Sequence, residues 1–144
     1  MANGAGFSGT GAGAVRAAEA MLRAQGGETV RLMLPIPYGA DAQQQALGLA
    51  AVEMEEVALG PAAVSCLTEM SGQQAQYELL LAATAVEQAA EARQIATGTE
   101  LLRLARGVVH REKWLTLLSV QTSYCGGTAY LYRLRARERS DASS

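Results

Sequence analysis

Four arginines at two-residue spacing are the residues of this sequence that most clearly suggest a chemistry. In an extended chain, successive side chains point to opposite faces, so these four guanidinium groups are predicted to line one face of a strand. Guanidinium groups bind carboxylates and phosphates in a bidentate manner. The pattern therefore predicts contact with a negatively charged partner. The four residues are Arg133, Arg135, Arg137 and Arg139, in the segment TAYLYRLRARER.

The partner of this arginine face has three interpretations. An acidic surface of a neighbouring protein is the first, and nucleic-acid phosphate without sequence specificity is the second. Plain exposure to solvent is the third. Tyr130 and Tyr132 lie on the same strand but share the parity of Leu134 and Ala136, so they are predicted to point away from the arginines. Base stacking beside the arginines, and hence reading of a base sequence, is not expected.

Three carboxylates close together, Glu53, Glu55 and Glu56, form the second charged cluster. Paired carboxylates can perform acid–base catalysis, and Glu53 and Glu55 are predicted to share one face of a strand. The sequence places no histidine or nucleophile beside them. We therefore expect an interface or a solvated strand edge, where acidic residues also discourage stray edge pairing.

The single histidine, His110, and the two cysteines, Cys66 and Cys125, are too few to close a tetrahedral zinc site. A nucleophilic pair of cysteine and histidine remains open from the spacing. However, Cys66 lies in an apolar strand pattern and Cys125 near a hairpin tip, which favours packed or bystander thiols that a cytoplasmic protein keeps reduced. We predict no metal, no cofactor and no catalytic residue.

Charge is unevenly distributed along the 144 residues. The net charge is −2, but residues 1–102 carry −7 and residues 103–144 carry +5. Such segregation suits head-to-tail packing of identical subunits, or one face toward a polyanion and another toward a basic partner. The aromatic share is only 5%, which indicates a core of small and aliphatic side chains and a stability that depends partly on assembly.

The sequence has no apolar run of about 18 residues, so no membrane-spanning helix is predicted. The N-terminus lacks a basic segment followed by a continuous apolar stretch, so we expect no secretory signal and a cytoplasmic site of synthesis.

The first third of the chain is predicted to contain an arm, a helix and a strand. Five glycines lie within residues 4–13, which indicates a flexible arm over residues 1–13. Helical spacing of apolar residues follows over residues 14–25 and ends at Gly26 and Gly27. Residues 28–35 alternate as a strand, and residues 38–46 are polar and loop-like.

The middle of the chain is predicted to contain short strands and one helix. Two extended regions, residues 47–59 and 62–67, are expected on either side of a turn at Gly60 and Pro61. A loop over residues 71–76 leads to a strand over 77–83. A helix is expected over residues 84–96, with Thr84 and Glu87 as a capping box and Gly98 as its end. Residues 100–106 fit either a helical turn or a strand.

A hairpin closes the chain. Residues 113–121 are predicted to pair with 128–137 around a turn that uses the positive φ available to Gly126 and Gly127. Residues 140–144 are expected to be a disordered tail. We therefore predict one mainly β domain over residues 14–139, with one or two short helices, built as a small barrel or sandwich with extended loops and the N-terminal arm.

Three stretches resemble the small neck proteins of tailed bacteriophages and gene transfer agents, the stopper or head-completion type of head–tail connector. They are the helix leading into ETVRLMLP, the central YELLLAATAVEQAA, and the closing strand, glycine turn and last strand ending in basic residues. The resemblance lies in pattern and element order, and it implies a small β-barrel without catalysis. It also implies a ring of identical virion subunits, assembled in the host cytoplasm around the DNA passage. The neighbours of this ring would be the portal or its adaptor and the tail proteins, and the polar loops at 38–46 and 68–76 and the glycine-rich arm would order against them.

The alternative is a cytoplasmic β-barrel binding module that uses the arginine face to hold an acidic partner or nucleic acid. An enzyme built on Cys66 or Cys125 with His110 is a third hypothesis.

Overall fold

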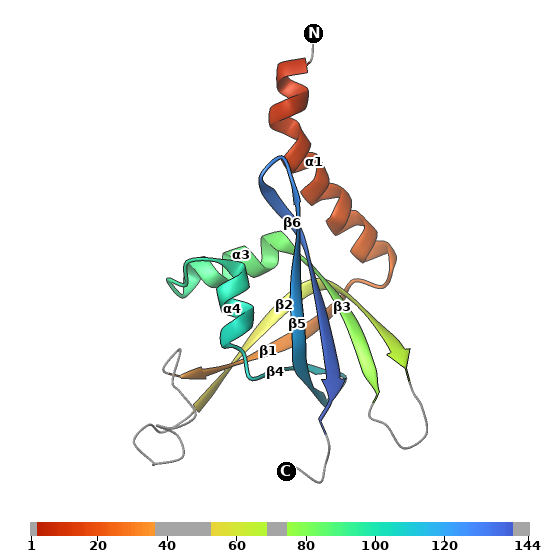
Figure 1. Ribbon diagram of the computed structural model, residues 1–144, viewed down its shortest axis with the longest axis vertical. Helices are drawn as coiled ribbons and strands as arrows, with labels where there is room; N and C mark the ends of the chain where they lie inside the picture. Colours follow the sequence, from red (N-terminus) through yellow and green to blue (C-terminus); the bar gives the residue numbers. More distant parts are fainter. Residues whose placement is uncertain (1–2, 37–52, 69–74, 140–144) are drawn as a thin grey trace.

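The computed structural model describes residues 3–36, 53–68 and 75–139 (Figure 1). Three predicted segments lie wholly or mostly outside these residues: the loop at 38–46, the loop at 68–76 and the tail at 140–144. Among the described elements, a first helix is followed by a run of strands, a pair of helices and a second run of strands. They are α1 (Asn3–Ala24), β1 (Glu28–Ile36), β2 (Glu53–Thr68), β3 (Gln76–Ala82), α3 (Ala83–Ala92), α4 (Gly98–Leu104), β4 (Gly107–His110), β5 (Lys113–Cys125) and β6 (Thr128–Glu138).

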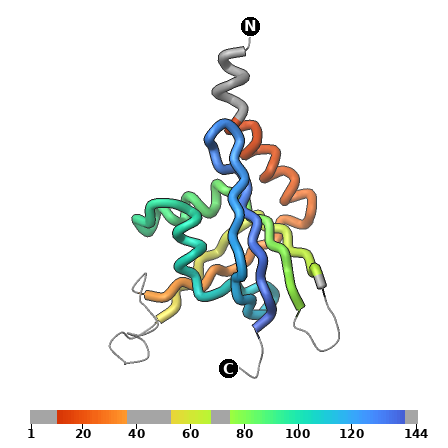
Figure 2. The backbone as a smooth tube through the Cα atoms, in the orientation of Figure 1, coloured from red at the N-terminus to blue at the C-terminus, as the bar shows by residue number. Residues whose placement is uncertain are grey.

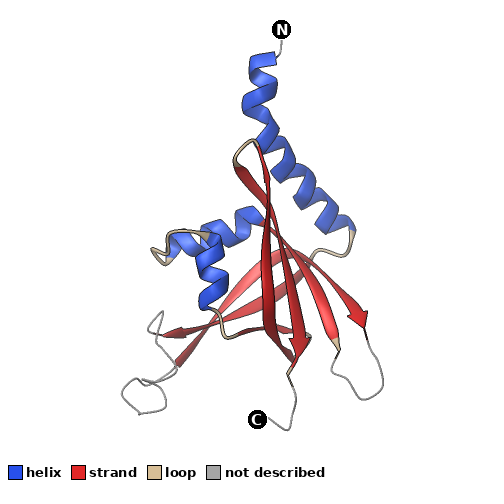
Figure 3. Cartoon of the chain, viewed as in Figure 1, coloured by secondary structure: helices blue, strands red, loops and turns tan. Residues whose placement is uncertain are grey.

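The six strands close into an antiparallel barrel in the order β1-β2-β3-β6-β5-β4. Helices α3 and α4 pack at one side, and α1 lies along the outside and extends past the end of the barrel (Figure 3). This arrangement confirms the mainly β prediction and selects the barrel over the sandwich. The described residues contain three helices, more than the one or two short helices expected.

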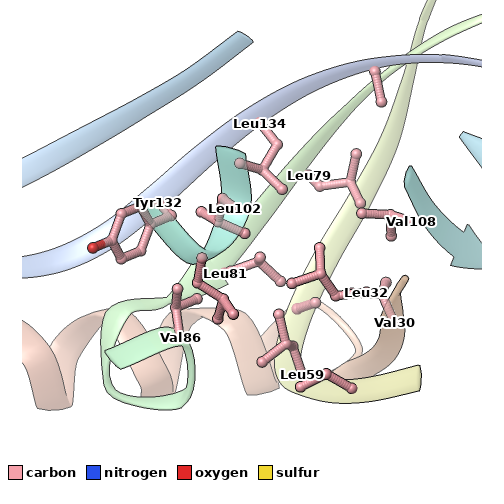
Figure 4. Close-up of a cluster of buried hydrophobic side chains, with 14 of the residues drawn as sticks. Val30, Leu32, Leu59, Leu79, Leu81, Val86, Leu102, Val108, Tyr132 and Leu134 are labelled. Atoms are coloured by element: carbon pink, nitrogen blue, oxygen red, sulfur yellow. The ribbon is translucent and has the colours of Figure 1, made fainter. Parts of the chain in front are cut away.

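The barrel interior is filled by aliphatic side chains that alternate along the strands (Figure 4). Alternation places every second residue of a strand inside, and buried residues recur at two-residue spacing on β1, β2, β3 and β6. On β6 these are Tyr132, Leu134 and Ala136, all with 1% exposure or less. Helices α3 and α4 cover the interior with further buried residues, among them Val86, Leu101 and Leu102.

Helix α1 ends where the sequence predicts. Gly26 and Gly27 both have positive φ, and the Gly27 N–H donates to the carbonyl of Leu22, which is a glycine C-terminal stop. The beginning of the helix differs from the expectation, because α1 starts at Asn3 rather than at residue 14. The described part of the expected arm, residues 3–13, is therefore helical, and the domain boundary predicted at residue 14 falls inside α1.

One glycine of this segment has a packing reason. A Cβ at Gly11 would lie 2.6 Å from Oγ1 of Thr128, so only glycine lets the helix approach the tip of the β5–β6 hairpin this closely. In Figure 2 the tip of the β5–β6 hairpin lies beside α1. Farther along α1, Ala18 and Leu22 pack on the outer face of the barrel against Ala63 and Leu131.

Strand β2 corrects a prediction. We expected a turn at Gly60 and Pro61 between two short strands, but the peptide bond between them is cis and the strand continues through it from Glu53 to Thr68. From Glu53 to Ala62 β2 pairs with β1, and from Ala62 to Thr68 it pairs with β3. Proline inside a strand indicates an edge or a bulge, and Pro61 marks the place where β2 changes its partner from β1 to β3.

The helical region also differs in detail. Helix α3 begins at Ala83 and has no side-chain cap, so the predicted capping box of Thr84 and Glu87 is wrong. Gly98 does not end this helix but begins α4, which is capped by the Thr97 hydroxyl accepting from the Glu100 N–H. The ambiguous residues 100–106 are therefore mostly helical.

The closing hairpin is confirmed. Residues of β5 pair with β6 from Leu115 with Glu138 to Cys125 with Thr128, around Gly126 and Gly127 at φ of 58° and 79°. Both glycines have the left-handed conformation of a tight two-residue turn.

Candidate functional site

The arginines of β6 lie on the outer wall of the barrel, as predicted. Arg133, Arg135 and Arg137 are exposed, while Leu134 and Ala136 between them are buried. Residues two apart along a strand are separated by about 7 Å. We call Arg133, Arg135 and Arg137 the arginine strip.

Two members of the strip have no ion pair within the described part of the chain. Arg133 has a partner in Glu78 of β3, at 3.7 Å between Nε and Oε2. The side chains of Arg135 and Arg137 make no salt bridge or hydrogen bond within the described residues, although their backbones belong to the ladders with β3 and β5. The strip therefore offers two guanidinium groups on an exposed strand face.

The fourth arginine is placed differently. Strand β6 ends at Glu138, and the Arg139 guanidinium stacks over the ring of Trp114 at 4.7 Å from its centroid, within range of a cation–π contact. The Arg139 N–H also donates to the Trp114 carbonyl at 2.9 Å. Through these two contacts with Trp114, Arg139 stabilises the end of the hairpin, and it is not part of the strip.

The surroundings of the strip define its limits. Toward the hairpin tip the same outer face continues to Leu131, which is buried under α1. On β5 the residues paired with Arg135 and Arg133 are Ser119 and Gln121, both exposed and uncharged. Of the two tyrosines predicted to point away, Tyr132 is fully buried inside, and Tyr130 packs against the cluster beneath α1.

The three carboxylates of β2 separate into three environments. Glu55 accepts two hydrogen bonds from Arg93 of α3, at 3.1 Å from Nε and 2.8 Å from Nη2. Glu56 accepts from Arg31 of β1 at 3.1 Å, and both of these side chains are about half exposed. Glu53 is exposed and has no salt bridge among the described residues.

This acidic end of β2 and the arginine strip lie on different sides of the molecule. In the barrel order, β1 and β6 are three strands apart in either direction, which places them across the barrel from each other. The acidic end belongs to the part of β2 that pairs with β1, and in Figure 1 it extends away from β3 and β6. One subunit therefore presents unlike charges on opposed sides.

The single histidine pairs with a carboxylate, and Cys125 lies far from it. His110 Nε2 lies 2.8 Å from Oε1 of Glu28, which also pairs with Arg111 at 3.0 Å. These partners lower the pKa of the Glu28 carboxyl, chiefly through the hydrogen bond to His110. Cys125 is at the far end of β5, about 40 Å along the strand from Lys113, which pairs with His110. The two cysteines form no disulfide with each other.

A hydrogen-bond network that the sequence did not suggest connects helices α3 and α4 with β6. The buried Tyr132 hydroxyl donates to one oxygen of Glu87 in α3, and the Gly98 N–H donates to the other at 3.0 Å. Burial and the neighbouring carboxylate raise the pKa of Tyr132. A Cβ at Gly98 would lie 2.6 Å from the Tyr132 oxygen, so glycine is required here. The parity of Tyr132 with Leu134 was the available signal for a buried tyrosine.

Shallow grooves lie around the helices in the described part of the chain. One of about 280 Å³ lies between α4 and β5, one of about 470 Å³ at the end of α3, and one of about 430 Å³ between α3 and β2. Within the described ranges, no three histidine, cysteine, aspartate or glutamate residues are grouped so as to hold a metal ion. Nor does any helix of the described part have the length and apolarity needed to cross a membrane.

Comparison of the chain with protein families, with curated proteins and with solved structures finds no match.

Proposed function

We propose that the protein is a structural subunit of the head–tail neck of a tailed bacteriophage or gene transfer agent, assembled into a ring between the portal or adaptor and the tail. The observation that carries the proposal is the opposed placement of the arginine strip and the acidic end of β2 on a closed barrel. The order of helix, strands, glycine turn and basic last strand supports the same class.

Opposed and unlike surfaces favour head-to-tail contact. A two-fold interface joins the same patch of both subunits, which would bring arginine against arginine. A heterologous contact joins two different patches, and it closes into a ring when the rotation between subunits allows it. The exposed Arg135 and Arg137 of one copy are suited to meet the exposed Glu53 of the next.

Charge reversal in the full-length chain tests this contact. The Arg135→Glu/Arg137→Glu variant is expected to be monomeric by native mass spectrometry and size-exclusion chromatography, where the unaltered protein forms a closed oligomer. Glu53→Arg is expected to weaken the same oligomer. Arg16→Glu changes an exposed arginine of α1 and serves as the control for net charge.

Mixing the two reversed variants makes the test specific. Each reversed patch then faces a complementary patch on the other variant, so oligomers with an even number of alternating subunits are expected to return. A wild-type chain that stays monomeric at every concentration, both alone and with portal and tail proteins, would contradict the ring. Neighbouring reading frames for portal, capsid and tail tube would support the neck class directly.

The same arginines also favour a second candidate, a binding module for nucleic acid. Exposed guanidinium groups without partners are suited to phosphate contacts that do not depend on base sequence. A duplex-DNA affinity of the monomer that falls steeply with salt, and falls further in Arg135→Glu/Arg137→Glu, would favour this candidate over the ring.

A further inference from the structure

Strand β2 has one edge that is not paired with another described strand over part of its length. From Glu56 to Leu59 it pairs with β1 on one side, whereas pairing with β3 on the other side begins only at Ala62. Backbone N–H and C=O groups alternate between the two edges of a strand. The groups of this segment that point away from β1 therefore face no strand of the described structure.

Helix α3 lies beside this edge and leaves a groove. Figure 1 shows α3 above the part of β2 that leads toward the acidic end, and the groove between them has a volume of about 430 Å³. Four of the eight residues that line it are small, two from β2 and two from α3. These are Ala58, Gly60, Ala85 and Ala89.

An unpaired strand edge beneath a helix has the geometry of strand addition. In this mode an extended peptide forms backbone hydrogen bonds with the edge, and pockets on either side accept alternate side chains. The segment from Glu56 to Gly60 spans about 13 Å of extended chain, enough for several backbone hydrogen bonds. Alanine and glycine on both walls leave room for the side chains of an added strand.

The charges beside the groove select the kind of strand. Arg93 at its end is neutralised by the bidentate contact with Glu55. Among the described residues, Glu56 pairs with Arg31 in an exposed contact, and Glu53 is exposed beyond it. Pairing of this edge with the same edge of a second copy would bring these carboxylates together, which is unfavourable.

We propose that the edge of β2 from Glu56 to Gly60, together with α3, is a docking site for an extended basic segment of another polypeptide. Small side chains of that segment face Ala85 and Ala89, and its lysine or arginine residues meet Glu53 and Glu56. The site is separate from the arginine strip and does not require a ring, and Glu53 is the residue that it shares with the ring contact proposed above.

Synthetic peptides test the site on the full-length protein. The probe is a seven-residue peptide in which lysine alternates with valine and alanine. Its binding is measured by isothermal titration calorimetry and by amide hydrogen exchange of residues 56–60. Binding is expected to slow exchange in this segment and to weaken as salt rises. The matched probes are the same peptide with glutamate for lysine and the same peptide with proline at alternate positions, which removes backbone donors.

Two substitutions locate the binding. Ala89→Trp fills the groove from α3 and is expected to abolish both binding and the change in exchange, and Ala58→Trp does the same from β2. Ala92→Trp introduces the same side chain at an exposed position of α3 outside the groove and is expected to preserve binding.

Three results would overturn the proposal. The first is equal binding of the acidic and basic peptides. The second is slow exchange of residues 56–60 in the free protein, comparable to the barrel strands, because the edge would then already be paired. The third is no binding of the basic peptide to a protein whose exchange shows an open edge.

Discussion

The two charged regions of this barrel teach different lessons about what an alternating sequence specifies. On β6, alternation places Arg135 and Arg137 outside with no ion pair among the described residues. At the acidic end of β2, a residue of the same kind of alternating pattern, Glu55, binds Arg93, which is 38 residues away in sequence. Periodicity therefore assigns a residue to a face, whereas its partner depends on which elements the fold brings to that face.

The largest expected effect tests alternation on the basic side. Leu134→Ala removes a fully buried side chain and is expected to lower the free energy of unfolding by about 2–5 kcal/mol, from lost burial and the cavity left behind. The adjacent Arg135→Ala, on the exposed face, is expected to change it by about 0.5 kcal/mol or less. Urea unfolding of both variants measures the difference. Equal effects would mean that the two faces of β6 are not distinct.

The next effect compares two ion pairs of the acidic side. Arg93→Met leaves Glu55 partly buried without its two hydrogen bonds and is expected to cost about 1.5–3 kcal/mol of unfolding free energy. Arg31→Met breaks the pair with Glu56, in which both side chains are about half exposed, and is expected to cost about 1 kcal/mol or less. Thermal and urea unfolding report both values. A larger cost for Arg31→Met would reverse the order that burial predicts.

The same contrast explains what the sequence predicts of the fold. The β5–β6 hairpin depends on a local glycine turn and on strict alternation, and both its pairing and its arginine face follow from the sequence. Strand β2 depends on remote partners: β1 and β3 hold it extended through Gly60 and Pro61, where local turn preferences indicated a break. Helix α1 likewise begins among glycines of low helix propensity.

The candidate site shows the same division. Exposure of the arginine strip is predictable because it needs only the strand period. The network of Glu87 with Tyr132 and Gly98 is not, since Glu87 and Tyr132 are 45 residues apart and the spacing of Glu87 from Thr84 also fits a cap. Likewise, Arg139 has the spacing of the strip but stacks on Trp114, a contact set by strand pairing.

A smaller effect separates paired from unpaired carboxylates by pH. The lowered pKa of Glu28 means that its pairing with His110 and Arg111 contributes stability above the ordinary pKa of 4.5, and that this contribution is lost as the pH falls through the folded-state pKa. Glu28→Gln is expected to reduce the unfolding free energy by about 1 kcal/mol at neutral pH, with the difference from wild type vanishing in acid. Glu53→Gln, at an exposed carboxylate without a salt bridge among the described residues, is expected to change the unfolding free energy by about 0.5 kcal/mol or less. Urea unfolding across this pH range measures both.

The smallest effect compares the two turns that flank β5. Gly126 and Gly127 form one at positive φ, whereas the turn between β4 and β5 places Arg111 and Glu112 at φ of 50° and 67°. A left-handed residue with a Cβ costs about 1–2 kcal/mol, and glycine recovers this less its own entropic cost of about 0.5–1 kcal/mol. Glu112→Gly is therefore expected to raise the unfolding free energy by about 0.5 kcal/mol, measured by urea unfolding. Lys113→Gly, one residue later in the exposed start of β5, is expected to lower it, because glycine weakens a strand without relieving strain. Destabilisation by Glu112→Gly would mean that the Glu112 side chain contributes more than its backbone conformation costs.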